Sequence, residues 1–323
     1  MLLSLVLIVI GFAFLVWGAD RFIAGAAATA RNLGVSPLII GLTVVGFGTS
    51  APEMVVSGVA ALRGNPGLAV GNAIGSNIAN MALVLGVAAL IYPLQVHSAT
   101  LRREYPVLLT VTVASLLLMV DGVLTLTDGI ILLVGLLAMT TWMTFLGMRR
   151  SGPDPMAAEF ASEIPTDMST PAAIGWLVVG MIVLPASSHI LVTGATSIAL
   201  FLGVSDLVIG LTIVAIGTSL PELAAAVASV LKREHELVIG NVVGSNMFNL
   251  LGVLGIASTL RTTEVERTVL LRDYSTMLTL TVLLFLISYG FRGPGRISRV
   301  AGALLLTIFV AYELMVFYTE YSS

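Results

Sequence analysis

The stretch LGVSPLIIGLTVVGFGTSAPE, residues 33–53, occurs a second time as LGVSDLVIGLTIVAIGTSLPE, residues 202–222. About fifteen of the twenty-one positions are identical at a shift of 169 residues. The same shift aligns GNAIGSNIANMALVLG, from Gly71, with GNVVGSNMFNLLGVLG, from Gly240, without a gap. The two halves of the chain are therefore duplicates of each other.

The composition is typical of a membrane protein. Of the 323 residues, 57% are hydrophobic and 10% are charged, and the mean hydropathy is +1.04, whereas a soluble domain carries about 25% charged residues. The apolar residues form runs of roughly 16 to 26 positions, as membrane-spanning helices require, rather than the alternating strands of an outer-membrane barrel. The absence of cysteine excludes disulfide scaffolds and thiolate sites, and the scattered basic residues exclude nucleic-acid binding.

Ten transmembrane helices are predicted from the apolar runs. We place them at residues 2–19, 37–62, 67–92, 105–120, 123–147, 171–195, 206–231, 237–260, 274–291 and 299–319. Residues 1–148 then form a first five-helix repeat, residues 149–170 a hydrophilic linker, and residues 171–323 a second five-helix repeat. Because each repeat has an odd number of spans, the second must start on the opposite face of the membrane. The sequence therefore predicts an all-α membrane protein of two inverted repeats, the architecture of many secondary transporters.

The distribution of Lys and Arg predicts the orientation. Alternate loops divide into a set with about eleven of these charges and a set with about four, and the richer set is cytoplasmic by the positive-inside rule. The linker at residues 149–170 belongs to the richer set, so it is expected in the cytoplasm and both termini outside. The expected location is the inner (plasma) membrane of the cell.

Two carboxylates, Glu53 and Glu222, occupy equivalent positions near the middle of their spans. A charge at that depth costs about 2.5 to 3.5 kcal/mol on insertion scales, so it needs a partner. No Lys or Arg lies at a comparable depth in the sequence. A bound cation is therefore the remaining candidate.

The hexapeptides GTSAPE and GTSLPE, which end at these glutamates, predict a break in each helix. Pro52 and Pro221 lack a backbone donor and clash with the preceding turn, and Gly48 and Gly217 loosen that turn further. A break at the midplane frees carbonyl oxygens. It also directs the negative end of the preceding half-helix at the gap, which favours a cation.

Two further polar pairs repeat at i and i+4, so each pair lies on one helix face: Ser76 with Asn80, and Ser245 with Asn249. All the groups offered are carboxylate, hydroxyl, amide or carbonyl oxygens. Such oxygens suit hard ions such as Ca²⁺, which takes six to eight of them at about 2.3 to 2.6 Å, and argue against zinc or copper. No cofactor is expected besides the transported ions.

Structural interpretations of both motifs remain open. Ser50-x-x-Glu53 and Ser219-x-x-Glu222 also fit capping boxes, in which serine and glutamate satisfy the donors of a restarting helix. Capping does not require a charge, however, so the repeated use of glutamate favours a cation site. The GSNxxN faces also fit helix packing through small residues and amides.

The other polar residues are predicted to be structural. Histidines near loop ends are interpreted as surface residues: His97, His189 and His235. Acids near span ends are interpreted as interfacial caps or loop charges: Asp20, Glu104, Asp121, Asp128 and Asp273.

The doubled motifs GTSxPE and GNxxGSNxxN resemble the alpha-repeat signature of the cation/Ca²⁺ exchanger superfamily, in particular its bacterial inner-membrane calcium/sodium antiporter branch. The resemblance covers nearly all of the chain. It implies a ten-helix fold in which the second, third, seventh and eighth helices enclose a midplane site. It further implies calcium binding by Glu53 and Glu222 together with Thr49 and Thr218, sodium sites completed by Ser50, Ser219, Ser76 and Ser245, and a central position for Asn80 and Asn249. Known exchangers often have Asp at one of these last two positions, whereas both are Asn here.

The function predicted on this basis is secondary active exchange of Na⁺ for Ca²⁺ by alternating access, with Ca²⁺ efflux driven by Na⁺ entry. The proton-coupled branch typically has an acidic residue in a GNxxE context, whereas the corresponding stretches here read GNAIGSN and GNVVGSN. Sodium is therefore the favoured counter-ion, and an H⁺-coupled calcium/cation antiporter is the alternative.

Two other functions are less favoured. An intramembrane aspartyl protease needs aspartates that share a proton, and it leaves the duplicated motif unexplained. A calcium channel does not need inverted repeats with broken helices, which favour alternating access. The protein is not expected to be an enzyme, and its expected partners are Ca²⁺, Na⁺ and the lipid bilayer, with no nucleic acid and no obligate protein partner.

Overall fold

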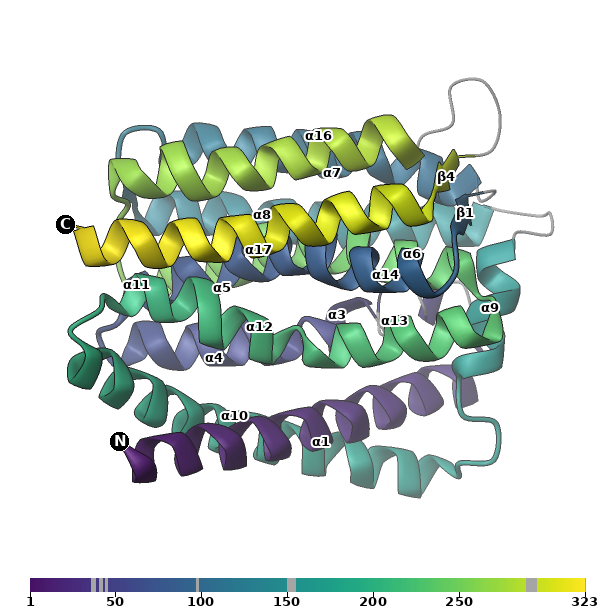
Figure 1. The fold of residues 1–323 in the computed structure, drawn as a ribbon. Helices are drawn as coiled ribbons and strands as arrows, with labels where there is room; N and C mark the ends of the chain where they lie inside the picture. The colour runs from purple at the N-terminus through teal and green to yellow at the C-terminus, as the bar shows by residue number, and fades with distance from the viewer. Residues whose placement is uncertain are drawn as a thin grey trace.

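The computed structural model describes residues 1–35, 39–40, 43, 46–96, 99–149, 155–288 and 295–322, and this part of the chain is almost entirely helical (Figure 1). The first half contains α1 (Leu2–Asn32), α3 (Gly46–Thr49), α4 (Ala51–Leu62), α5 (Pro66–Ile78), the π-helix η2 (Ala79–Val84), α6 (Leu85–Ile91), β1 (Leu94–Val96), α7 (Ala99–Met119), β2 (Val123–Leu124) and α8 (Leu126–Arg149). The linker contains α9 (Pro155–Glu163).

The second half repeats this order. It contains α10 (Thr170–Leu202), α11 (Asp206–Ile209), η3 (Gly210–Val214), α12 (Ala215–Thr218), α13 (Leu220–Lys232), α14 (His235–Phe248), η4 (Asn249–Val253), α15 (Leu254–Leu260), β3 (Thr263–Glu264), η5 (Val269–Tyr274), α16 (Ser275–Ser288), β4 (Gly295–Ile297) and α17 (Arg299–Ser322). The elements around the two GTSxPE motifs correspond one to one. The duplication seen in the sequence is therefore also a duplication of local structure.

Eight helices among the described residues are long and apolar enough to cross a membrane: Leu2–Asn32, Pro66–Ile91, Leu126–Phe145, Thr170–Leu202, Asp206–Lys232, His235–Leu260, Val269–Ser288 and Arg299–Glu320. The predicted fourth span corresponds to α7, which begins with several charged residues, and the predicted second span, residues 37–62, begins partly outside the described residues. A multi-pass membrane protein is confirmed. The total of ten spans and the inverted relation of the two halves remain predictions.

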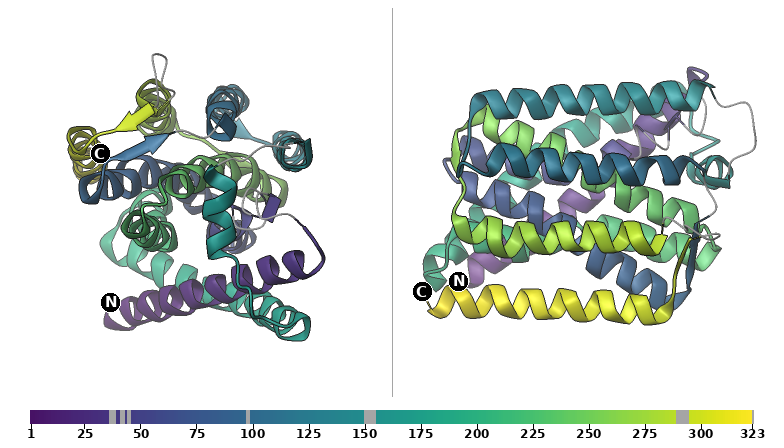
Figure 2. Two further views of the ribbon diagram at one scale, coloured as in Figure 1. Left: turned by 90° about the vertical axis from the view of Figure 1, so that its right-hand side faces the viewer. Right: turned by 90° about the horizontal axis from the view of Figure 1, so that it is seen from above.

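Helices α1 and α10 are longer than predicted, at 31 and 33 residues. α1 continues through the charged residues Asp20 and Arg21, and the Arg21 guanidinium lies over the Trp176 ring of α10, 4.8 Å from its centroid. At about 1.5 Å per residue both helices are longer than the roughly 30 Å hydrocarbon layer of a membrane. They lie side by side and run in opposite directions, as a layer beside the other helices (Figures 1 and 2).

The motif helices form the centre of the molecule. Buried residues make up 94% of the apolar window in the helix His235–Leu260 and 78% in Pro66–Ile91, but 22–28% in peripheral helices such as α8 and α17. Large apolar side chains are exposed on those peripheral helices, where lipid is the solvent. The two GNxxGSNxxN motifs are therefore shielded from lipid.

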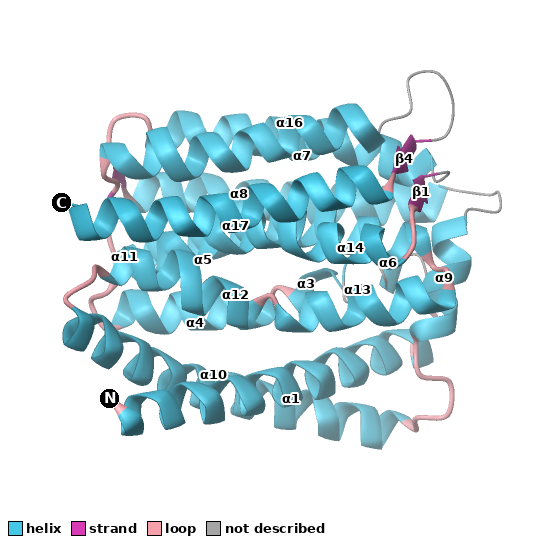
Figure 3. Cartoon of the chain, viewed as in Figure 1, coloured by secondary structure: helices cyan, strands magenta, loops and turns pink. Residues whose placement is uncertain are grey.

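Two short antiparallel ribbons join the halves at opposite ends of the helices. β1 pairs with β4, with Leu94 opposite Ile297, and β2 pairs with β3, with Val123 opposite Glu264. Each ribbon takes one strand from each half, and the β1–β4 ribbon lies at the end that carries α9 (Figure 3). Backbone strand pairing thus connects the two halves at both ends of the helices.

Two acids predicted at interfaces or in loops are instead buried, so that interpretation was wrong for Glu104 and Asp273, which are 1% and 0% exposed. Asp273 accepts hydrogen bonds from Arg272, at 2.7 Å, and from the Tyr312 hydroxyl, at 2.9 Å. Both acids begin apolar runs, which suggests an interface, but tertiary packing turns them inward. His189 is exposed beside Arg63, His235 stacks on Tyr92, and His97 lies outside the described residues.

Candidate cation site

Glu53 and Glu222 each lie in the first turn after a helix interruption. The chain leaves the helix at Ser50 (φ −86°, ψ 0°) and at Ser219 (φ −83°, ψ 1°), and α4 and α13 begin at the next residue. Pro52 has no N–H to donate to the carbonyl of Gly48, and Pro221 has none for Gly217. The predicted breaks are therefore observed, and each one leaves a backbone oxygen without its usual helical donor.

Both glutamates are fully buried, with 0% exposure. In the described part of the chain, none of their four carboxylate oxygens has an ion-pair partner or a hydrogen bond of ordinary geometry. The hydroxyls of Thr218 and Ser245 act only as weak donors toward Glu53 and Glu222, respectively. The two side chains interact with each other electrostatically, although they come from different halves. A pair of buried carboxylates without a protein cation beside them calls for a positive partner.

The capping-box interpretation is not supported by the geometry. Ser50 and Ser219 occupy the N-cap positions of α4 and α13, but neither side chain makes a capping hydrogen bond. Their hydroxyl oxygens are buried and have no partner among the described residues. The serines therefore add two free oxygens beside the glutamates.

Thr49 and Thr218 connect each interrupted helix to the other half of the chain. The Thr49 hydroxyl lies 3.0 Å from the Ser245 hydroxyl and 3.1 Å from Asn241 Oδ1. The Thr218 hydroxyl lies 3.3 Å from the Ser76 hydroxyl and donates to Asn72 Oδ1 at 3.0 Å. The structure thus brings these predicted threonines and serines together across the halves.

Asn72 and Asn241 were missed by the sequence analysis. Asn72 also donates to Ser57 Oγ, at 2.9 Å, and to the Glu53 carbonyl, at 3.3 Å. The sequence pattern could have identified them. In each GNxxGSN motif the first asparagine lies four residues before the serine and therefore on the same helix face.

Asn80 and Asn249 lie where each motif helix passes into a π-helix, a distortion often found at functional sites. The Asn80 amide nitrogen donates to Asn246 Oδ1 at 3.3 Å, and the Asn249 amide nitrogen donates to Asn77 Oδ1 at 3.0 Å. The Oδ1 atoms of Asn80 and Asn249 are buried without a partner among the described residues. The amide nitrogens of Asn80 and Asn249 therefore join the two halves, as the packing interpretation predicts, while their Oδ1 atoms remain available to a cation.

All ten predicted site residues are buried, with exposures of 0 to 5%: Thr49, Ser50, Glu53, Ser76, Asn80, Thr218, Ser219, Glu222, Ser245 and Asn249. Four equivalent pairs of side-chain oxygens lack partners in the described residues: both oxygens of Glu53 and Glu222, Oγ of Ser50 and Ser219, and Oδ1 of Asn80 and Asn249. In that part of the chain, no group of three or more His, Cys, Asp and Glu residues is arranged so that it could hold a metal ion. This donor chemistry fits a hard cation and not a soft transition metal.

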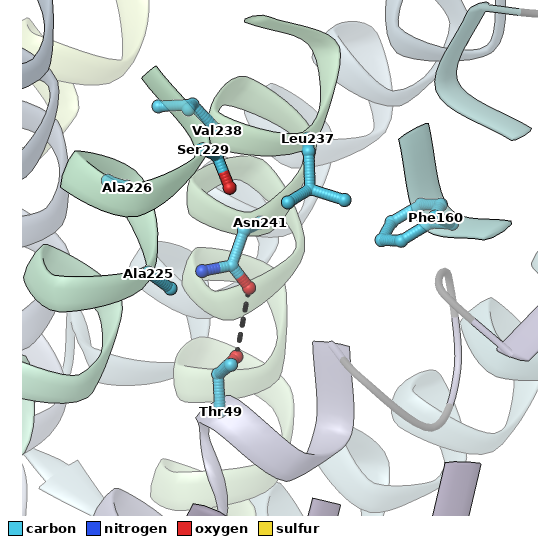
Figure 4. Close-up of a pocket in the computed structure, with 8 residues that line it drawn as sticks. All are labelled: Thr49, Phe160, Ala225, Ala226, Ser229, Leu237, Val238 and Asn241. Carbon is cyan, nitrogen blue, oxygen red and sulfur yellow. Dashed lines mark hydrogen bonds between the residues drawn. The ribbon is translucent and has the colours of Figure 1, made fainter. Parts of the chain in front are cut away.

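A small cavity lies beside Thr49 and Asn241, at the end of the site nearest the linker (Figure 4). Its volume is about 40 Å³, and Phe160 of α9 contributes to its wall. That volume exceeds the roughly 10 to 15 Å³ that one water needs. Phe160 and Met156 are 3% and 0% exposed, so the hydrophilic linker contains a helix that packs against the membrane helices.

Known proteins resemble this chain over nearly its whole length. The family described as sodium/calcium exchanger protein matches residues 3–146 and 172–318. The protein CaxA of Alkalimonas amylolytica is 44% identical over 317 residues, which cover 98% of this chain and 99% of that protein. The inner membrane protein YrbG of Escherichia coli (strain K12) is 40% identical over 323 residues, covering 98% of each.

A solved structure is similar as well. The sodium-calcium exchanger NCX_Mj, soaked with Na⁺ and Sr²⁺, superimposes with a TM-score of 0.68 at 31% sequence identity. The match covers 96% of this chain and 97% of that one. The similarity therefore includes both halves of the chain and the central helices that carry the candidate site.

Proposed function

Because the chain belongs to the family of sodium/calcium exchanger proteins, we propose that it exchanges Na⁺ for Ca²⁺ across a membrane by alternating access, with Glu53 and Glu222 as the shared ion ligands. One observation carries the proposal. The two carboxylates are buried at equivalent positions of the two halves, and no described residue neutralises them. Such a pair is costly in a low-dielectric interior unless cations accompany it.

Electrostatics then couples the two ions. One Ca²⁺, or a set of Na⁺ ions, compensates the two negative charges of the glutamates. If Ca²⁺ and the Na⁺ ions bound at the same time, the site would carry excess positive charge in a poorly solvated space, where like charges repel strongly. Binding of Ca²⁺ and binding of Na⁺ therefore exclude each other, and an exchanger requires this mutual exclusion.

The neighbouring oxygens complete the proposed sites. Thr49 and Thr218 bind calcium with the glutamates, Asn80 and Asn249 lie at the centre, and four serines complete the sodium sites: Ser50, Ser219, Ser76 and Ser245. The unpartnered hydroxyl oxygens of Ser50 and Ser219 support this assignment most directly. Ser76 and Ser245 are held in place by the threonine hydroxyls.

Alternating access requires that the two ends of the site open in turn. At the end away from the linker, α5 packs directly on α11 and η3, since a Cβ at Gly71 would clash with the Leu207 carbonyl and one at Gly210 with the Leu68 carbonyl. At the linker end, Phe160 forms part of the wall of the cavity beside Thr49 and Asn241. With the linker in the cytoplasm, as the positive-inside rule predicts, Na⁺ entering from outside would drive Ca²⁺ out of the cell.

Radioactive calcium uptake into proteoliposomes tests the proposal. Vesicles loaded with Na⁺ and diluted into Na⁺-free medium should take up Ca²⁺, and reversing the sodium gradient should reverse the flux. Choline-loaded vesicles are the control and should show no uptake.

Three outcomes of this assay would contradict the proposal. Uptake that ignores the sodium gradient would refute sodium coupling. Uptake driven by a pH gradient without sodium would favour the H⁺-coupled antiporter. Uptake without any counter-ion would favour a channel.

A further inference from the structure

The side-chain amides of Asn80 and Asn249 are oriented by residues of the opposite half. Asn246 Oδ1 accepts from the Asn80 amide nitrogen at 3.3 Å, and Asn77 Oδ1 accepts from the Asn249 amide nitrogen at 3.0 Å. Asn77 and Asn246 are themselves equivalent, at the shift of 169 residues that relates the two motifs. The same orientation therefore occurs twice, once in each half.

The orientation of an amide decides whether it can bind a cation. The oxygen of an asparagine side chain carries lone pairs, whereas its NH₂ group only donates and would face a cation with its positive end. In Asn80 and Asn249 the nitrogen is engaged, and the oxygen is buried without a partner among the described residues. Each amide thus has one face committed to the protein and one left for a ligand.

Asn77 is itself held in place. Its amide nitrogen donates to the Asn246 backbone carbonyl at 3.2 Å and lies 3.5 Å from the Met277 sulfur. Asn77 and Asn246 are 1% and 0% exposed, so water does not compete for these bonds. A rotated Asn249 amide would lose its acceptor and would leave two buried polar groups mismatched, at a cost.

We propose that Asn77 and Asn246 are positioning residues, which fix the carbonyl oxygens of Asn249 and Asn80 toward the transported cation and thereby set the affinity for Ca²⁺. The inference rests on the proposed exchange function. It assigns no ligand role to Asn77 or Asn246. They act as outer partners that orient the ligands, and loss of such partners typically weakens metal binding about 10- to 100-fold.

A double-mutant cycle separates orientation from packing. Aspartate at position 249 presents oxygen on both branches, so its orientation no longer matters. Asn77→Ala should therefore weaken Ca²⁺ binding about 10- to 100-fold in the otherwise unchanged protein. The same substitution should leave the affinity of the Asn249→Asp protein nearly unchanged.

The chain offers a matched control and a mirror experiment. Asn77→Ala combined with Asn80→Asp should keep the full loss, because Asn77 does not orient Asn80. Asn246→Ala with Asn80→Asp repeats the cycle in the other half and decides the question if Asn77→Ala does not fold.

Calcium binding to the purified full-length proteins in detergent should be measured by titration calorimetry, with thermal unfolding without Ca²⁺ as the check of folding. Absence of binding in the unsubstituted protein would overturn the proposed function and this inference together. If the unsubstituted protein binds Ca²⁺, two outcomes would overturn the positioning role alone. One is that Asn77→Ala causes no loss of affinity. The other is that Asn77→Ala causes the same loss in the Asn249→Asp protein as in the unsubstituted protein.

Discussion

Thr218 donates its hydroxyl hydrogen to Asn72 Oδ1 at 3.0 Å, although the two residues are 146 positions apart. Thr49 and Asn241 repeat this bond at 3.1 Å with the halves exchanged. Each threonine directly precedes the serine at which its helix is interrupted. The bonds therefore tie both interruptions to the neighbouring motif helices and hold the glutamates at the centre of the molecule.

We expect Glu53→Gln and Glu222→Gln each to abolish calcium transport while the protein stays folded. Glutamine keeps the shape of glutamate and removes the charge that attracts the cation. The measurement is sodium-gradient-driven calcium uptake, with size-exclusion chromatography in detergent as the check of folding.

The matched control is Glu264→Gln, since Glu264 is exposed in the β3 strand, and it should transport normally. If a stable Glu53→Gln or Glu222→Gln protein still transported calcium, the capping interpretation of the motif would be favoured. The assignment of these glutamates as ion ligands would then be refuted.

Asn72→Ala should lower both stability and calcium affinity. Asn72 is 0% exposed and bonds to Thr218, Ser57 and the Glu53 carbonyl, so its loss leaves buried polar groups unpaired, at a cost of about 1 to 3 kcal/mol in the free energy of unfolding. Thermal unfolding in detergent and calcium titration measure the two effects. Asn241→Ala is the comparison and should destabilise less, because Asn241 is partly exposed; an equal loss would contradict this account.

The docking of α9 should weaken as the pH rises. The pKa of the Glu159 carboxyl is raised from 4.5 to about 7, chiefly by burial. The bond that its Oε2 accepts from the Leu237 N–H, at 2.7 Å, opposes the shift, and the nearby charges of Glu236 and Glu234 contribute to it. Since the pKa is higher in the docked state, docking is most favoured below pH 4.5, and this contribution is lost as the pH rises to about 7.

Hydrogen exchange in residues 155–164, corrected for the intrinsic rate, should therefore show less protection at about pH 8 than at about pH 5.5. Glu159→Gln, which cannot ionise, should remove the dependence. Protection that rises with pH in the unsubstituted protein would contradict the assigned direction.

Asp273→Ala should destabilise the protein by about 3 kcal/mol, because it leaves Arg272 without its buried partner and Tyr312 without its acceptor. Thermal unfolding in detergent measures this change. Asp121→Ala removes an exposed acid near the same end of the molecule and should shift stability by less than about 0.5 kcal/mol. Equal effects of the two substitutions would mean that the burial of Asp273 does not matter energetically.

Much of the site could be predicted because its signals are local. The helix interruptions follow from proline and glycine chemistry at Pro52 and Pro221, and the depth of Glu53 and Glu222 follows from the apolar residues around them. The end of α1 was placed too early, because Asp20 and Arg21 interrupt the apolar run, whereas the helix continues through both and Arg21 contacts Trp176. Trp176 lies 155 positions further along the chain.

A helical membrane protein with a duplicated, oxygen-rich motif could be predicted from the amino-acid sequence, because composition, repetition and backbone breakers act over a few turns of chain. The bonds of Asn72 and Asn241 to the threonines, the bonds of Asn77 and Asn246 to the central amides, and the docking of α9 beside the site became visible only in the folded molecule. These relationships join residues more than 70 positions apart. Helical periodicity specifies which face a side chain occupies but not which distant helix it meets, and that choice is made by packing.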